Sequence, residues 1–457
     1  MLYTKKFGKV WGYQEGPTNV LVISDLKDVK ELLHSRFDDF QQRKPLTPLF
    51  QPEADDPQSH LADSWGARWK RLRALVSPQF SNNSLKKVSP TVSDSAAHLV
   101  EHIGKNAGKA SIDIHTYYQE YTIDVISRIA MGQKESRQWR SDLSETLKFT
   151  VGRDPRDVFF IIATVIPSLK KYLRAFFIAL SRFFKLPTVE LLTTIEKAVA
   201  ERKIQRAKGE LCSKEKELVD FIDLFLDAEA EVDLKAEEGI SGRNAHIIRR
   251  MLEEEVVMQC FVFLLAGFDT TSSALSYSTW YLAKHPQIQR RLQEEIDQVY
   301  GEEEISYDGL GELKYMDCVL KETLRLNPLG TVVVSRVAGQ DLELAGVQLK
   351  KGDQIQVDAY SLQRDKEIWG DDAEEFNPDR WLNLTVEQKE ADLSFGAGPR
   401  QCVGMRLANI EQKVAFARIL QEYDFVSGPN TEKELDLAGW ITVSPKSVTV
   451  DIRKRKK

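Results

Sequence analysis

One cysteine, Cys402, lies in a glycine-rich stretch of a kind that often carries a reactive or metal-binding thiolate. Cys402 lies in the stretch "FGAGPRQCVG" (395–404), which holds three glycines, one proline and one arginine in ten residues. A cysteine on such a loop can be a nucleophile, a zinc ligand, or the axial ligand of a larger metal cofactor, because each of these roles uses a thiolate. The rest of the chain must decide among the three.

Each alternative makes a demand on the sequence. A nucleophilic cysteine usually requires a histidine as its general base. The seven histidines lie far from Cys402 in sequence, which weakens this role without excluding it. A zinc site wants three or four clustered ligands, and none accompanies Cys402. Gly396 and Gly398 are followed by Pro399, so the loop is no G-x-G-x-x-G dinucleotide fingerprint either. The chain is therefore not expected to bind NADPH itself.

A haem fits the loop better. Small residues allow backbone N–H groups to turn toward the sulfur, and Arg400 can neutralise a nearby carboxylate. A haem offers both an iron for the sulfur and propionates for the arginine.

The motif carries a family resemblance. "FGAGPRQCVG" is similar at every defined position to F-x-x-G-x-R-x-C-x-G, the cysteine-ligand signature of the cytochrome P450 family of haem-thiolate monooxygenases. Further stretches resemble the family's other motifs in the family's order. They are "WKRLR" (69–73), "AGFDTT" (266–271), "KETLRLNP" (321–328) and "FNPDRW" (376–381).

The resemblance implies a role for each matched residue. Cys402 would be the iron ligand of heme b, and Asp269 with Thr270 would form an acid and alcohol pair that organises water and protons above it. Glu322 and Arg325, with Arg380, would form a structural charge cluster beneath the haem. The implied cofactor-binding residues are Trp69, Arg73, Arg336, Phe395, Arg400 and Cys402, with Arg43 as a weaker candidate.

The elements that must position these residues are mostly helical. Apolar residues recur at three- and four-residue spacing through much of the chain, and alternating strand-like runs occur near the start and again late. We expect a mainly α fold with small β-sheets, the cytochrome P450 fold with a long central helix over the haem, in one domain spanning 1–457. Its small β-rich part would combine N-terminal and late strands. The central helix is predicted over 247–283, with a local widening at 267–273 where glycine and clustered hydroxyls disfavour regular helix.

The resemblance also implies the reaction and its partners. We expect insertion of one atom of O2 into a lipophilic small molecule (steroid, fatty acid or xenobiotic), with electrons from a separate NADPH-dependent flavoprotein reductase. A basic proximal face would receive it, formed by the cluster at 68–73 with Lys86, Lys87, Arg406 and Lys413. Predicted substrate walls are 46–64, 263–271, 329–334 and the tip at 440–441. The alternatives are a reductase-independent haem-thiolate isomerase and a non-catalytic haem-binding protein.

Composition bears on partners and location. The net charge of −6 argues against a nucleic-acid ligand. No signal peptide is recognisable, and the longest charge-free runs fall short of the ~20 apolar residues that cross a bilayer. The phenylalanine-rich segment from Val158 to Pro187 is expected to touch a membrane peripherally. The chain most resembles the animal branch of steroid- and drug-oxidising members and thromboxane synthase. Its microsomal members begin with an anchor that is not recognised here, so we expect the cytosolic face of the endoplasmic reticulum membrane or the cytoplasm.

Overall fold

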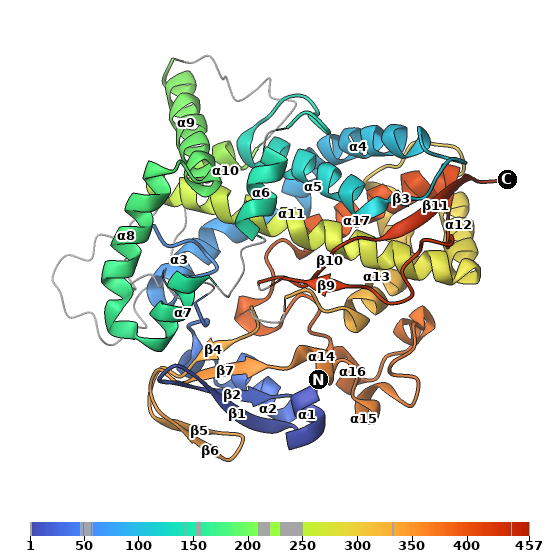
Figure 1. The fold of residues 1–457 in the computed structure, drawn as a ribbon. Coiled ribbons are helices and arrows are strands. Elements are labelled where there is room, and N and C mark those ends of the chain that lie inside the picture. Colours follow the sequence, from blue (N-terminus) through green and yellow to red (C-terminus); the bar gives the residue numbers. More distant parts are fainter. Residues whose placement is uncertain are drawn as a thin grey trace.

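The computed structural model describes residues 2–45, 49, 56, 58–141, 143–151, 157–208, 220–228, 250–330, 333–439 and 441–456. The longer helices carry most of the fold (Figure 1). They are α3 (Gly66–Val76), α4 (Asn82–Gly104), α5 (Ile114–Met131), α6 (Leu143–Val151), α7 (Val158–Val165), α8 (Lys170–Phe183), α9 (Pro187–Ala207), α10 (Phe221–Asp227), α11 (Glu253–Lys284), α12 (Pro286–Tyr300), α13 (Lys314–Leu326) and α17 (Met405–Glu422).

Short helices and strands fill the remainder. The short α-helices are α1 (Leu2–Phe7), α2 (Leu26–Lys30), α14 (Ala359–Leu362), α15 (Lys366–Trp369) and α16 (Val386–Ala391), and η1 (Glu31–Ser35) is a π-helix. The strands are β1 (Val10–Glu15), β2 (Thr18–Ile23), β3 (Ile112–Asp113), β4 (Arg336–Val337), β5 (Leu342–Leu344), β6 (Val347–Leu349), β7 (Gln354–Val357), β8 (Tyr423–Val426), β9 (Leu437–Ala438), β10 (Ser444–Pro445) and β11 (Thr449–Lys454). The mainly α fold with small sheets is confirmed.

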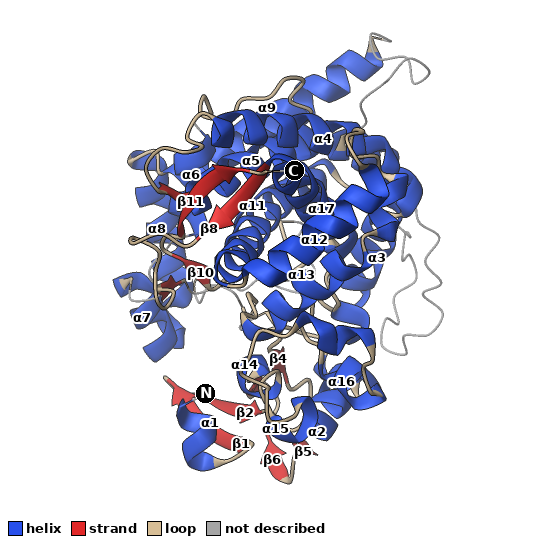
Figure 2. Cartoon of the chain, turned by 90° about the vertical axis from the view of Figure 1, so that its right-hand side faces the viewer, coloured by secondary structure: helices blue, strands red, loops and turns tan. Residues whose placement is uncertain are grey.

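The largest sheet joins two strands near the start of the sequence to two strands from its last third. Its order is β1-β2-β7-β4, with β2 parallel to β7 and the other neighbours antiparallel. The strand-like run near the start forms β2, and its last four residues, 20–23, are all buried, so both faces of this strand are covered. In both ribbon views this sheet lies at one end of the molecule and the long helices lie at the other (Figures 1 and 2). Arg336 is thereby placed on β4, opposite Ile355 of β7.

Helix α11 crosses the centre of the helical part (Figure 1). It begins at Glu253, later than predicted, and residues 247–249 lie outside the described residues. Among the described helices, α11 alone is long and apolar enough to cross a membrane, and 67% of its most apolar window is buried inside the protein. Its apolar surface therefore packs within the fold.

The predicted widening of this helix is wrong, because α11 stays α-helical throughout. The clustered hydroxyls bond back to their own helix: Thr270 Oγ1 donates to the carbonyl of Ala266 at 2.7 Å, and Ser276 Oγ donates to that of Ser272 at 2.7 Å. Gly267 is explained by packing, since a Cβ there would lie 2.9 Å from Ile126 Cδ1 on α5. Glycine lets the two helices approach closely at this point.

Candidate haem-thiolate site

The cysteine loop is bent by two glycines with positive φ, Gly396 at +70° and Gly398 at +69°. The backbone N–H of Cys402 donates to the carbonyl of Phe395 at 2.9 Å and closes the loop. A Cβ on Gly398 would lie 2.0 Å from the carbonyl oxygen of Leu33 in η1. This position therefore needs glycine both for its conformation and for the close approach to η1.

The thiol of Cys402 lies at the start of α17. The backbone N–H groups of Gly404 and Met405 hydrogen bond to the sulfur, and Arg43 and Arg73 lie within electrostatic reach. Burial nevertheless raises the pKa of the thiol above its ordinary value, and these four groups oppose that rise. The side chain still has exposed surface.

Four guanidinium groups gather beside the cysteine loop: Arg43, Arg73, Arg336 and Arg400. Burial and the repulsion of Arg43 lower the pKa of Arg336 to about 9, and burial with the repulsion of Arg43 and Arg336 lowers that of Arg400 to about 8. The Nε atoms of Arg43, Arg336 and Arg400 are buried without a hydrogen-bond partner. Asp63 is near Arg43 and Arg400, and it pairs with His60 at 3.2 Å.

Local packing fixes the orientation of these cations. The Arg400 guanidinium lies 4.5 Å from the ring centre of Trp69, which is 5% exposed on α3, and its Nη2 donates to the Ser64 carbonyl at 2.5 Å. Arg43 Nη2 donates to the carbonyl of Arg400 at 2.8 Å, which ties the N-terminal loop to the cysteine loop. The predicted residues Trp69, Arg73, Arg400 and Cys402 are thus brought together. Arg43, only a weak candidate from sequence, belongs with them.

The two residues predicted for proton delivery, Asp269 and Thr270, lie on α11, and their side chains hydrogen bond to other groups. Thr270 donates to Ala266, and the exposed surface of Ala266 is unusual for the middle of a core helix. Asp269 is 6% exposed, and its Oδ2 accepts hydrogen bonds from Thr442 Oγ1 and, at 2.7 Å, from Ser444 Oγ. The acid is therefore held by the C-terminal hairpin, a contact that the sequence did not predict.

Phe395 joins the cysteine loop to α11. Its ring packs against a small buried cluster formed by Ala274, Tyr277, Leu324 and Leu329. Leu329 belongs to a predicted substrate wall, of which residues 331 and 332 lie outside the described residues. Within the predicted wall at 46–64, residues 46–48, 50–55 and 57 lie outside the described residues, as does residue 440 of the predicted tip.

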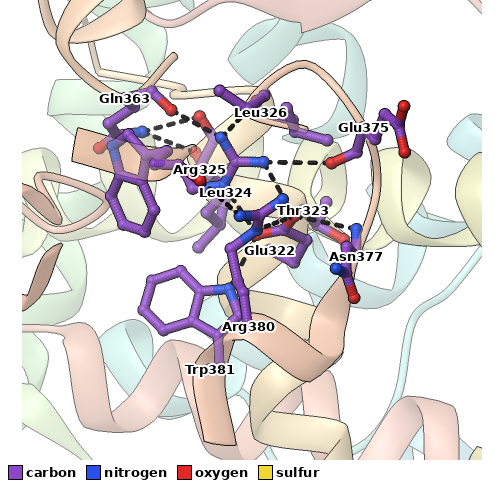
Figure 3. Close-up of polar contacts among 12 residues, drawn as sticks. Glu322, Thr323, Leu324, Arg325, Leu326, Gln363, Glu375, Asn377, Arg380 and Trp381 are labelled. Carbon is purple, nitrogen blue, oxygen red and sulfur yellow. Dashed lines mark hydrogen bonds and ion pairs between the residues drawn. The ribbon is translucent and has the colours of Figure 1, made fainter. Parts of the chain in front are cut away.

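The predicted cluster of Glu322, Arg325 and Arg380 is present (Figure 3). Glu322 and Arg325 are 0% exposed, and the Arg325 Nε and Nη2 atoms each lie 2.8 Å from a Glu322 oxygen. Arg380 Nε reaches Glu322 at 2.9 Å, and the indole of Trp381 donates to the second oxygen at 2.9 Å. Arg325 Nη1 also donates to the carbonyls of Gln363 and Ala373, both at 2.7 Å.

The predicted basic face needs correction, because several of its charges are paired. Arg68 Nη2 lies 2.5 Å from Glu255, a fully buried carboxylate at the start of α11, and Arg71 reaches the same oxygen. Lys413 is buried and lies 2.8 Å from Asp317. These carboxylates are far away in sequence, so the sequence did not show that they pair with Arg68, Arg71 and Lys413. Lys87 and Arg406 are exposed.

The arrangement fits a flat dianionic group with a metal at its centre. The thiol of Cys402 lies where backbone N–H groups at a helix N-terminus point, and buried guanidiniums whose Nε atoms have no partner among the described residues lie nearby. Cys402 and Ala266 both have exposed surface. Carboxylates brought among the guanidiniums would satisfy their orphaned Nε–H groups and offset their mutual repulsion. The two propionates of a haem are such carboxylates.

Comparisons with known proteins agree. The family model described as Cytochrome P450 matches residues 1–451. The chain is 42% identical over 461 residues to the putative cytochrome P450 CYP13A10 of Caenorhabditis elegans, covering 99% of this chain and 88% of that protein. It is 42% identical over 458 residues to CYP13A2 and 40% identical over 456 residues to cyp-13B1 of the same organism, with the same coverage. The chain therefore belongs to the cytochrome P450 family and is a monooxygenase that binds heme b.

Proposed function

We propose that this monooxygenase oxidises a lipophilic small molecule (a steroid, fatty acid or xenobiotic) with electrons from a separate NADPH-dependent flavoprotein reductase. The observation that carries the proposal is the placement of a thiol at the N-terminus of α17 close to buried arginines whose Nε atoms have no hydrogen-bond partner among the described residues. The apolar character of 263–268 on α11 and of Leu329 favours an apolar substrate.

Each site residue receives a role under this proposal. Cys402 would hold the haem iron through its sulfur, and the N–H groups of Gly404 and Met405 would stabilise the thiolate form of that sulfur. Phe395 closes the loop over the ligand through its carbonyl. The propionates would be bound by Trp69, Arg73, Arg336 and Arg400, together with Arg43.

The haem supplies reductive activation of O2, which thiolate ligation favours over reversible binding. The protein's own part is to exclude bulk water, hold the apolar substrate and supply protons. Asp269 is the acid for that last task, and the Thr270 hydroxyl is exposed in the same turn of α11.

Membrane contact is proposed through the segment 158–187. Within it, α7 and α8 present large apolar side chains to solvent and lie at one edge of the molecule in both ribbon views (Figures 1 and 2). A patch of this kind is typical of a surface that meets lipid. The most exposed are Val158 (59%), Val165 (57%), Tyr172 (72%), Phe176 (57%), Phe183 (80%) and Phe184 (63%). This patch would place the enzyme at the cytosolic face of the endoplasmic reticulum membrane.

The ligand assignment is tested by the absorbance spectrum of the reduced, carbon-monoxide-treated protein. Wild type should give the thiolate-type band, and Cys402→Ala should lose it. Cys318→Ala is the matched control, since Cys318 is a buried thiol on α13, and it should keep the band. A wild type without the band contradicts the proposal. Substrate turnover that needs no reductase would favour the isomerase alternative, and a normal band without any turnover would favour the haem-binding protein.

The membrane assignment is tested by flotation with phosphatidylcholine vesicles. Replacing Phe183 and Phe184 by serine should lower vesicle binding by roughly 10-fold or more. Burying each aromatic side chain in lipid contributes about 1.5–3 kcal/mol to the free energy of binding. Val386→Ser is the control, since Val386 is 72% exposed on α16, outside the patch. Equal loss in the control would show that the patch has no special role.

A further inference from the structure

One carboxylate of the protein, that of Asp63, lies beside two of the buried arginines of the site. Burial lowers the pKa of Arg43 and of Arg400, and the negative charge of Asp63 opposes this fall in both guanidiniums. Hydrogen bonds account for the position. Arg400 Nη1 donates to the carbonyl of Ala62 at 3.4 Å, and its Nη2 donates to that of Ser64 at 2.5 Å. The guanidinium of Arg400 therefore bonds to the residues on both sides of Asp63.

The Asp63 carboxylate is held in place by its own loop. Its Oδ2 lies 3.2 Å from Nε2 of His60, and the two side chains are 16% and 11% exposed. The backbone N–H groups of Asp63 and Ser64 both donate to the His60 carbonyl, at 3.1 and 2.9 Å, and close a turn around the pair. The N–H of Leu61 donates at 2.9 Å to Oε1 of Gln259, a fully buried side chain on α11. The turn is thus tied to the central helix, and His60 keeps the carboxylate facing one place.

The charges of the site balance only when Asp63 is included. The four guanidiniums carry four positive charges. The propionates of one haem would bring two negative charges, and the thiolate of Cys402 would bring a third. Asp63 supplies the fourth. Without its carboxylate, the groups around the haem would keep an excess of positive charge.

Such an excess bears on the haem iron, because reduction of ferric haem adds one electron and makes the site more negative by one charge. A nearby carboxylate makes this addition less favourable, and burial strengthens the effect because the protein interior has a low dielectric constant. Charge and hydrogen bonding around a haem are among the means by which a protein sets its reduction potential.

We propose that Asp63, held by His60, is a positioning residue that acts through Arg43 and Arg400 and keeps the reduction potential of the haem low. The inference rests on the proposed function, because that function places the propionates among these arginines. It assigns Asp63 no contact with substrate and no part in proton transfer.

The first test is a spectroelectrochemical titration of the haem-loaded protein. Asp63→Asn removes the charge and keeps the shape. At the wild-type midpoint potential, its ratio of ferrous to ferric haem should rise about 10-fold, which is 59 mV for a one-electron couple. Asp63→Ser removes the same charge with a smaller side chain and should give the same rise. Asp63→Glu keeps the charge and should stay close to wild type.

The matched control for this titration is Asp56→Asn. Asp56 belongs to the same loop, and its Oδ1 accepts an exposed hydrogen bond from the N–H of Gln58 at 2.9 Å. Salt and solvent screen an exposed charge, so this variant should leave the ratio unchanged. A ratio equal to wild type in either folded neutral variant of Asp63, or an equal rise in Asp56→Asn, overturns the inference.

The second test separates an electrostatic role of Asp63 from a merely structural one. The rate of haem transfer to apomyoglobin should be no faster in Asp63→Asn than in wild type, because the guanidiniums lose a competing anion and bind the propionates at least as tightly. If Asp63 only shaped its loop, the variant would loosen the site and release haem faster. A raised ratio together with faster release therefore overturns the electrostatic role.

This inference and the proposed function fail in different ways. A wild type without the thiolate-type band contradicts the proposed function, whatever the titration shows. A normal band with an unchanged ferrous-to-ferric ratio in Asp63→Asn contradicts only the role of Asp63.

Discussion

Two clusters of buried arginines in this molecule differ in one respect. The two guanidiniums that bond Glu322 are matched: Arg325 makes two bonds to the carboxylate and two to backbone carbonyls, and Arg380 bonds the same carboxylate (Figure 3). Around Cys402, Arg336 and Arg400 are equally buried but keep unpartnered Nε atoms and repel each other. Satisfied buried charge is typical of a structural support, whereas unsatisfied buried charge of one sign indicates a site for a ligand of the other sign.

The largest effect is expected from breaking the satisfied cluster. Glu322→Gln leaves Arg325 and Arg380 buried without their anion, which should cost about 3–5 kcal/mol in the free energy of unfolding. Chemical denaturation of the haem-loaded protein measures it. The control Glu390→Gln removes an exposed partner of Lys30, at 2.7 Å, and should change stability by about 0–1 kcal/mol. Equal losses in the two variants would mean that the buried network contributes nothing special.

A smaller effect, confined to the cofactor, is expected in the unsatisfied cluster. Arg336→Met removes one buried cation that we assign to a propionate, a contact worth about 1.5–3 kcal/mol. Haem should dissociate roughly 10- to 100-fold faster, measured by transfer to apomyoglobin, while the far-ultraviolet circular dichroism stays unchanged. Arg455→Met is the control, because Arg455 pairs with Asp297 at 2.8 Å beyond the end of β11. Unchanged haem release in Arg336→Met would remove Arg336 from the site.

The smallest effect concerns a buried acid outside both clusters. Burial raises the pKa of Glu411 on α17 well above its ordinary value, and its Oε2 has no hydrogen-bond partner. The folded state then keeps a proton that the unfolded chain loses above about pH 4.3. The free energy of unfolding therefore falls as the pH rises from about 4.3 toward the raised pKa of the folded state, by up to about 1.4 kcal/mol per pH unit. Glu411→Gln should abolish this contribution to the slope. Denaturation at pH 5 and pH 6 checks this, and a slope equal to wild type would show that the carboxyl is ionised in the fold.

The sequence predicted those parts of the site whose members are close along the chain. Glu322 and Arg325 stand three residues apart on one helix, so their contact follows from helical periodicity. The glycines at 396 and 398 predicted a bent loop before Cys402, and their positive φ values confirm it. The long apolar run predicted a central helix, and α11 fills that place.

What only the tertiary structure decided lies between residues that are distant in sequence. Glu255 pairs with both Arg68 and Arg71, the segment 442–444 holds Asp269, and Arg43 donates to the Arg400 carbonyl in the cysteine loop. Gly267 had appeared to be a site of irregular helix and proved to be a site of close helix packing against Ile126. The physical reason is the same each time. Helical and strand periodicity fix neighbours within a few residues, whereas the partner of a long-range charge depends on how the whole chain packs.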